Sequence, residues 1–180
     1  DVSIADSIKF YKDDALLTTQ NSPLGAYVDT NATGLQSNTQ YSFVAKYYLS
    51  GSVVATSQKF SVFTKPNAPT NLQVLDVGIN TCLLSWTSPG GLGALTYKVY
   101  STPGTLMGTT ENNSISISGL SGGTAYDFYV VASNVSGDSV ESNTISATTL
   151  ESVVGWLCYY QDGIYKIPLY SSATIPRLAI

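Results

Sequence analysis

The chain has 180 residues, a net charge of −4, no histidine and only 11% charged residues. This length suits one or two domains with their own cores, and the absence of any Lys or Arg cluster excludes the basic stripe that nucleic-acid binding requires. The longest apolar run, Val153 to Tyr160, is far shorter than the roughly 20 residues of a membrane-spanning helix.

Short runs rich in Val, Ile, Thr, Tyr and Phe alternate with turns of Gly, Pro, Asn, Asp and Ser along most of the chain. Helical periodicity is nearly absent. This pattern predicts an all-β protein built as sandwiches or barrels.

The first predicted strand contains Ile8-Lys9-Phe10-Tyr11, and it is followed by a turn at Asp13-Asp14. Paired acidic residues can act as a glycosidase dyad, but neighbouring aspartates in a turn are far more often solvated. We therefore interpret Asp13 and Asp14 as turn residues.

The next segment reveals an internal repeat, because its pattern Gly-Leu, Thr, Tyr, Phe returns later in the chain. Gly34 and Gly119 are 85 residues apart, and so are Tyr41 and Tyr126. Residues 8–11 match residues 97–100 at a separation of 89, and residues 60–64 match residues 145–149 at 85. Two copies of one unit thus follow each other.

The second copy is complete. It opens on Ala68-Pro69-Thr70-Asn71-Leu72, continues through Leu84-Ser85-Trp86 and Tyr97-Lys98-Val99-Tyr100, and ends at Ala147-Thr148-Thr149. Over residues 66–149 it resembles a fibronectin type III domain. The resemblance implies an antiparallel β-sandwich of two packed sheets.

Alternation with a period of two predicts the core of both copies. It places Cys82, Leu84 and Trp86 on one face of a strand. The resemblance further implies a tyrosine corner at Tyr126, with Tyr41 as its counterpart. The predicted core residues are Trp86, Leu84, Tyr126, Phe128, Val130, Tyr41, Phe43, Leu35 and Leu120.

The first copy departs from the family pattern, since Ile8 already belongs to the third strand of the fold. We expect it to lack the two opening strands and their tryptophan, which would expose apolar surface and open edges. We expect an upstream portion of a longer protein to supply them, although another element could fill the gap.

The terminal segment reads as a hairpin. Val153 to Tyr160 is a short apolar strand, Asp162-Gly163 is a strong turn signal, and Ile164 to Tyr170 is the returning strand, which Pro168 keeps at an edge. A lone hairpin is marginal in water, so this one needs a surface on the sandwich, a neighbouring subunit or further chain. The candidate docking residues are Trp156, Tyr160, Tyr165, Ile167 and Leu169.

The expected domains are therefore a partial fibronectin-like domain at 1–65, a complete one at 66–149 and a docking hairpin at 150–180. The stretch Gly163 to Leu169 is also similar to short elements of tailed-phage structural proteins.

Catalytic chemistry is not predicted. Without histidine there is no Ser-His-Asp arrangement, no cysteine pair has zinc spacing, and no Gly-rich phosphate loop precedes a helix. We expect no enzyme activity, cofactor or metal. Cys82 is interpreted as a small buried thiol, and a bridge from it to Cys158 stays open.

Three kinds of surface signal remain. The family's adhesive loop carries Arg-Gly-Asp, but no Arg precedes Gly137, so integrin-type adhesion is not expected. Tyr48 and Tyr129 lie on the outward parity of their strands and could stack on carbohydrate. Three N-glycosylation patterns begin at Asn31, Asn112 and Asn134.

Three functions are consistent with these patterns. The first is a structural or decoration protein of a virus particle, such as a phage, whose partners are other copies or particle subunits. The second is a polysaccharide-binding or spacer module of a secreted bacterial enzyme or adhesin. The third is a eukaryotic adhesion ectodomain. All three place the chain on a virion surface or outside the cell.

Overall fold

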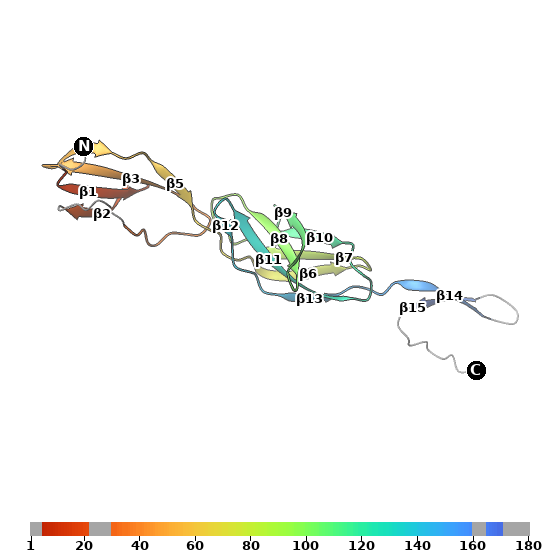
Figure 1. Cartoon of the computed structure of the whole chain (residues 1–180). Helices are drawn as coiled ribbons and strands as arrows, with labels where there is room; N and C mark the ends of the chain where they lie inside the picture. The colour runs from red at the N-terminus through yellow and green to blue at the C-terminus, as the bar shows by residue number, and fades with distance from the viewer. Residues whose placement is uncertain (1–4, 22–29, 160–164, 171–180) are drawn as a thin grey trace. The chain divides into compact units, whose positions relative to one another are not determined.

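The computed structural model describes residues 5–21, 30–159 and 165–170, with side chains up to residue 152. These residues form β-strands joined by turns, all paired antiparallel where pairing occurs (Figure 1). The prediction of an all-β, antiparallel fold is thereby confirmed.

The chain divides into two compact units. The first unit contains Asp1–Asn67 together with two short segments of the second repeat, Pro89–Leu95 and Ser133–Ser139. The second unit contains Ala68–Ser88, Thr96–Ala132 and Val140–Ile180. The units thus interleave along the sequence, and the division at 1–65, 66–149 and 150–180 stays a prediction about the sequence.

The first unit contains one five-stranded sheet among the described residues. Its order is β2-β1-β3-β4, and β5 pairs with β3 beyond the end of β4. The strands are β1 (Ser7–Lys12), β2 (Ala15–Asn21), β3 (Gln40–Leu49), β4 (Ser52–Thr56) and β5 (Phe60–Phe63). The expectation that this repeat lacks its opening strands stays a prediction.

The turn between β1 and β2 shows how the sequence produces this sheet. Asp13 and Asp14 have φ values of 49° and 65°, a left-handed conformation that Asp tolerates better than most residues. The Asp13 carboxylate accepts hydrogen bonds from the backbone N–H and the hydroxyl of Ser42, at 2.8 and 3.1 Å. These aspartates therefore shape and anchor a hairpin turn.

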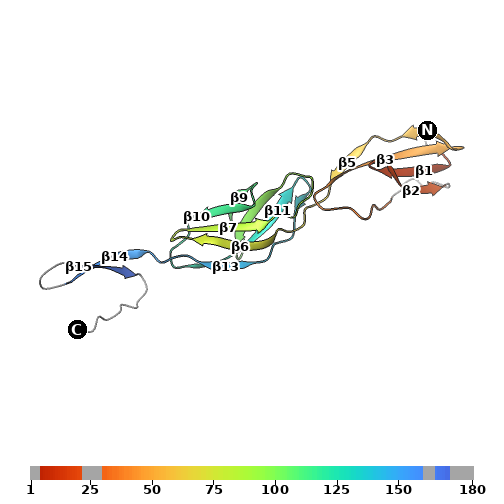
Figure 2. The same ribbon diagram turned by 180° about the vertical axis from the view of Figure 1, so that it is seen from behind.

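The fibronectin-like region, residues 68–149, contains two sheets. One has the order β10-β7-β6, and the other has the order β12-β11-β8-β9 with β13 on β11 (Figure 2). The strands are β6 (Thr70–Val77), β7 (Thr81–Thr87), β8 (Thr96–Ser101), β9 (Thr105–Thr110), β10 (Ser114–Ser118), β11 (Ala125–Asn134), β12 (Gly137–Asp138) and β13 (Ile145–Thr148).

The core between these two sheets is tightly closed. Leu84, Val99, Phe128 and Val130 are fully buried. Trp86 is 5% exposed and meets the ring of Tyr97 edge-on, with 5.3 Å between centroids. Alternation along β7 and β11 places these side chains on the facing sides of the sheets, as in aligned sandwiches.

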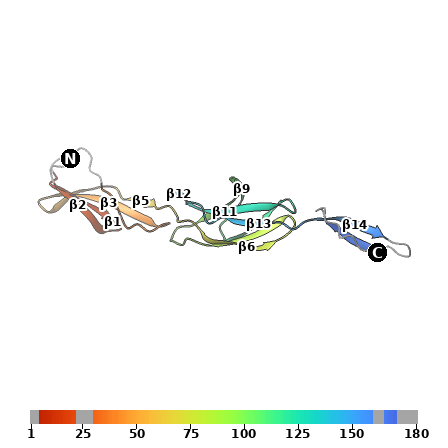
Figure 3. The ribbon, with the colours of Figure 1, turned by 90° about the horizontal axis from the view of Figure 1, so that it is seen from below.

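The C-terminal strands β14 (Val153–Tyr159) and β15 (Tyr165–Tyr170) form a two-stranded antiparallel sheet (Figure 3). Within the described part of the chain, β15 pairs only with β14, so Pro168 lies in an edge strand. The predicted turn at Asp162-Gly163 and the docking residue Tyr160 lie outside the described residues.

No helix among the described residues is long and apolar enough to cross a membrane.

Candidate functional site

Two tyrosine side chains close the same local motif in the two repeats. The hydroxyl of Tyr41 accepts a hydrogen bond from the backbone N–H of Gln36 at 2.8 Å. The hydroxyl of Tyr126 accepts one from the N–H of Ser121 at 2.9 Å. Both acceptors lie five residues after their donors, and both hydroxyls are used structurally, which leaves neither tyrosine as a candidate catalytic group.

The predicted core residues divide into two sets. Six of them, Trp86, Leu84, Phe128, Val130, Leu120 and Tyr41, are at most 8% exposed. The other three, Tyr126, Phe43 and Leu35, are half-buried. Phe43 is half-buried because no second sheet packs against its strand within the described residues.

The strand register defines one face of the first unit's sheet, which we call the open face. Phe10 on β1 lies opposite Ala45 on β3, and Phe43 lies opposite Phe60 on β5. Residues directly opposite in an antiparallel ladder share a face. The open face carries Ile8, Phe10, Lys12, Tyr41, Phe43, Ala45, Tyr47, Phe60 and Val62.

The open face is hollowed by an apolar groove of about 360 Å³. Phe60, at its rim, is 63% exposed, and Val62 beside it is 37% exposed. The groove is lined by Phe10, Tyr11, Leu17, Thr30, Phe43, Val44, Ala45, Ser57, Gln58 and Phe60. Exposed aromatic surface in a concave site is typical of an interaction site.

The second repeat shows how far the corresponding positions are buried when a second sheet covers them. Phe43 corresponds to Phe128, which is fully buried, and Ala45 corresponds to the fully buried Val130. In the second repeat these positions are covered by the sheet β10-β7-β6, which contributes Leu84 and Trp86. The sequence analysis predicted exposed apolar surface on the first repeat, but it did not single out Phe60.

A buried polar cluster lies around Asn38 in the first unit. The side-chain amide of Asn38, which is 0% exposed, donates to the carbonyl oxygens of Gly93 at 2.7 Å and Gly90 at 3.2 Å. Its Oδ1 accepts from the amide of Asn134 at 3.0 Å, and the same Asn134 amide donates to the carbonyl of Thr64 at 2.8 Å. A buried amide with all these partners fixes the conformation of the loops that it joins.

Gly91 is required for this packing. Its φ is 95°, and a Cβ built there would lie 2.6 Å from the Cβ of Asn38. Asn38 could not be singled out from the sequence, because a single Asn in a Ser-Asn-Thr turn carries no periodic signal. Only the Gly-Gly pair at 90–91 hinted at a close approach of backbone.

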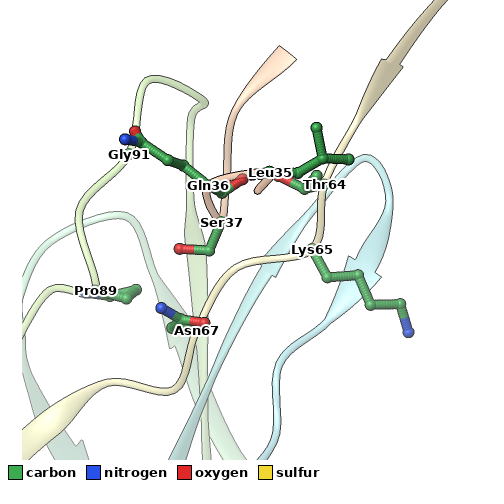
Figure 4. Close-up of a pocket in the computed structure, with 8 residues that line it drawn as sticks. All are labelled: Leu35, Gln36, Ser37, Thr64, Lys65, Asn67, Pro89 and Gly91. Carbon is green, nitrogen blue, oxygen red and sulfur yellow. Dashed lines mark hydrogen bonds between the residues drawn. The ribbon is translucent and has the colours of Figure 1, made fainter. Parts of the chain in front are cut away.

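Beside this cluster the first unit has a polar pocket of about 620 Å³ (Figure 4). In Figure 4, the Lys65 side chain extends away from Pro89 and Asn67. The pocket is lined by Leu35, Gln36, Ser37, Thr64, Lys65, Asn67, Pro89 and Gly91. Amide and hydroxyl groups can donate and accept hydrogen bonds, but none of them is an acid or base near neutral pH.

Among the described residues, no three His, Cys, Asp or Glu side chains gather in a group that could hold a metal ion. Cys82 is a buried free thiol, 1% exposed. Burial, with a smaller contribution from the carboxylate of Asp76, raises the pKa of this thiol above its ordinary value, so it is a poor nucleophile.

The outward tyrosines lie in two different settings. The hydroxyls of Tyr48 and Tyr11 are 2.9 Å apart, and the ammonium of Lys9 lies 4.3 Å from the Tyr48 ring centroid. Tyr129 instead stacks on Tyr100, with 5.3 Å between centroids and 14° between planes. The hydrogen bond to Tyr48 is the largest of the causes that raise the pKa of Tyr11.

The pKa of Tyr129 is also raised, first by partial desolvation and then by the charges of Glu141 and Tyr100. Because these tyrosines already pack against protein groups, a sugar would have to stack on the remaining ring surface. Carbohydrate binding at Tyr48 and Tyr129 stays a prediction.

The candidate docking residues lie on different positions of the hairpin. The register sets Trp156 opposite Pro168 and Leu157 opposite Ile167. Tyr165, Ile167 and Leu169 therefore share one parity of β15, while Trp156 has the other parity of the ladder.

Residues 67–148 match the family model of the fibronectin type III domain. Chitinase A1 of Niallia circulans is 36% identical over 135 residues, which are 67% of this chain and 19% of that protein. Exoglucanase B of Cellulomonas fimi is 32% identical over 140 residues, which are 70% of this chain and 13% of that protein. The chain thus spans less than a fifth of either relative.

Among solved structures, a two-domain fibronectin type III segment of chicken tenascin superposes with a TM-score of 0.50. It is 15% identical, and the match covers 79% of this chain and 83% of that one. This likeness shows the fold. None of these three proteins is a virus-particle protein, so they give the virion prediction no support.

Proposed function

Because residues 67–148 are a fibronectin type III domain, we propose that the chain is a non-catalytic spacer or interaction module of a larger extracellular protein. The observation that carries this proposal is the match to short parts of chitinase A1 and exoglucanase B. A segment common to a chitinase and an exoglucanase, which act on different polymers, does not encode the specificity of either.

The site geometry supports the same proposal. The conspicuous tyrosines Tyr41 and Tyr126 accept structural hydrogen bonds, the thiol of Cys82 is buried, and the polar pocket offers only hydrogen-bonding groups and one ammonium. The open face is an exposed apolar surface, which suits contact with a protein better than catalysis.

Hydrolysis and retention assays test this function. The purified chain is incubated with insoluble chitin and with cellulose, and reducing sugar and unbound protein are measured. We expect no sugar release and no depletion beyond that of an inert protein. Sugar release would overturn the non-catalytic assignment.

If a polymer depletes the chain from solution and Tyr129→Ala or Tyr48→Ala abolishes this depletion, the chain is a carbohydrate-binding module and not a spacer. Electron microscopy of the native source checks the virion alternative. Glycosylation at Asn31, Asn112 and Asn134 checks the eukaryotic-ectodomain alternative.

A further inference from the structure

Two parts of the chain have no hydrophobic layer packed on them among the described residues. The first is the open face, whose Phe60 and Val62 are exposed at 63% and 37%. The second is the hairpin β14–β15, which forms a sheet of only two strands within the described residues. Two isolated strands are marginally stable in water unless they pack on another element.

The second repeat shows which chemistry covers such a face. There Phe128 and Val130 are fully buried beneath an antiparallel sheet whose strand β7 alternates Cys82, Leu84 and Trp86. The occupant that the open face fits is accordingly an antiparallel strand pair with apolar residues at alternate positions. Two such layers pack about 10 Å apart.

The hairpin has this chemistry. Leu157 lies opposite Ile167 and Tyr159 lies opposite Tyr165 in the ladder. Opposite residues share a face of the sheet, and Leu169 follows on the same parity of β15. One face of the hairpin, which we call the apolar hairpin face, thus consists of Leu157, Tyr159, Tyr165, Ile167 and Leu169.

The hairpin is tethered closely to the second unit, whereas the open face belongs to the first unit. The N–H of Leu150 donates to the carbonyl of Gly78 at 3.0 Å, which fixes the chain to the second unit beside the end of β6. Only residues 151–152 then remain before β14 begins.

We propose that the hairpin β14–β15 of one copy packs its apolar hairpin face on the open face of a second copy. The contact joins two different surfaces, so each copy can accept one neighbour and donate to another. Such heterologous contacts build rings or filaments. This inference deepens the proposed module function by naming the partner, and it rests on that function.

The first experiment is the molar mass of the whole chain by light scattering over a range of concentrations. The expected result is a weight-average mass that rises with concentration to at least twice the 19.1 kDa of one chain. A constant 19.1 kDa at every concentration overturns the proposal.

Two single variants make the test specific. Phe60→Lys places a charge on the open face at a position that is already mostly exposed, so the sheet should still fold. Ile167→Lys places one on the apolar hairpin face. Leu106→Lys, at a 52% exposed strand position outside both surfaces, is the matched control and should assemble like the unaltered chain.

Each of the two variants alone should be monomeric, because each lacks one of the two surfaces. Mixed in equal amounts they should form a capped pair of twice the monomer mass, since the hairpin of Phe60→Lys still fits the open face of Ile167→Lys. A mixture that remains monomeric, or assembly by either variant alone, overturns the proposal.

The failure of this proposal differs from a failure of the proposed function. A monomeric chain without hydrolytic activity removes the self-association and leaves the non-catalytic module intact. Release of sugar from chitin or cellulose removes the module function whatever the mass is.

Discussion

The two repeats have corresponding strands, but they differ in how far one face of the sheet is buried. In the second repeat the sheet containing β8 and β11 faces a second sheet, and Phe128 is 0% exposed. In the first repeat the corresponding strands β1 and β3 keep their pairing and their tyrosine corner, yet Phe43 is half-buried and Phe60 is exposed. A sheet can thus keep its hydrogen bonds while one of its faces stays exposed. The exposure of that face decides which repeat can serve as an interaction surface.

The largest expected effect comes from matched truncations. Phe128→Ala should lower the free energy of unfolding of the second unit by about 3–5 kcal/mol, because it opens a cavity in a closed core. The equivalent Phe43→Ala should cost the first unit roughly 1–2 kcal/mol, since less of its surface is buried. Scanning calorimetry of both variants measures the two effects, and equal losses would contradict the difference between the repeats.

Trp86 sharpens the same comparison, because residues 1–65 contain no tryptophan. Trp86→Ala should cost about 3–5 kcal/mol in the second unit. Denaturant unfolding followed by far-ultraviolet circular dichroism measures it. A loss below about 1 kcal/mol would mean that the ring does not fill the core.

Asn38→Ala should destabilise the first unit by about 1–3 kcal/mol, because it removes a fully buried amide that donates to the carbonyls of Gly90 and Gly93. Asn31→Ala, at an exposed position, is the control and should be nearly neutral. Calorimetry of the two variants checks this. An unchanged Asn38→Ala would show that water satisfies these carbonyls.

The tyrosine corners should respond alike in both repeats. Tyr41→Phe and Tyr126→Phe each remove one hydrogen bond to backbone, from Gln36 and Ser121 respectively. Each should cost about 1 kcal/mol. A large inequality in thermal shift between the two would show that the corner depends on the opposing sheet.

The smallest effect is a pH dependence in the second unit. Burial raises the pKa of Cys82 in the folded state, so the folded protein holds this proton more tightly than the unfolded chain. The resulting stabilisation is complete below the thiol's ordinary pKa of about 8.5 and diminishes as the pH rises above it. Denaturation curves at pH 7 and pH 9.5 measure it, and the decline should be smaller in Cys82→Ala.

Much of this architecture could be predicted from local pattern. Period-two alternation located β7 and β11, and the repeat of Gly-Leu, Thr and Tyr located both corners. The break between β4 and β5 could not be predicted from local pattern. In this break the hydroxyl of Ser57 accepts a hydrogen bond from the backbone N–H of Ala45. Ala45 lies on another strand, so the neighbouring sequence carries no signal of this contact. Asn38 was missed for the same reason, since its partners lie up to 96 residues away.

The open face was predicted only in outline. The sequence indicated that two strands and a tryptophan were missing from the first repeat, but exposure of Phe60 depends on where β5 pairs with β3. The virion prediction relied on the short stretch Gly163 to Leu169 and on the resemblance to fibronectin-like domains. Neither a stretch of that length nor a fold used by many kinds of protein identifies a biological source.

Amide hydrogen exchange on the Ile167→Lys variant tests the central difference between the repeats most directly, because there the open face has no hairpin to cover it. β3 (Gln40–Leu49) and β11 (Ala125–Asn134) are matched ten-residue strands paired on both sides. The account predicts that β11 exchanges much more slowly than β3, because a second sheet closes the face of β11 and none of the described strands closes that of β3. Equal protection of the two strands would contradict it.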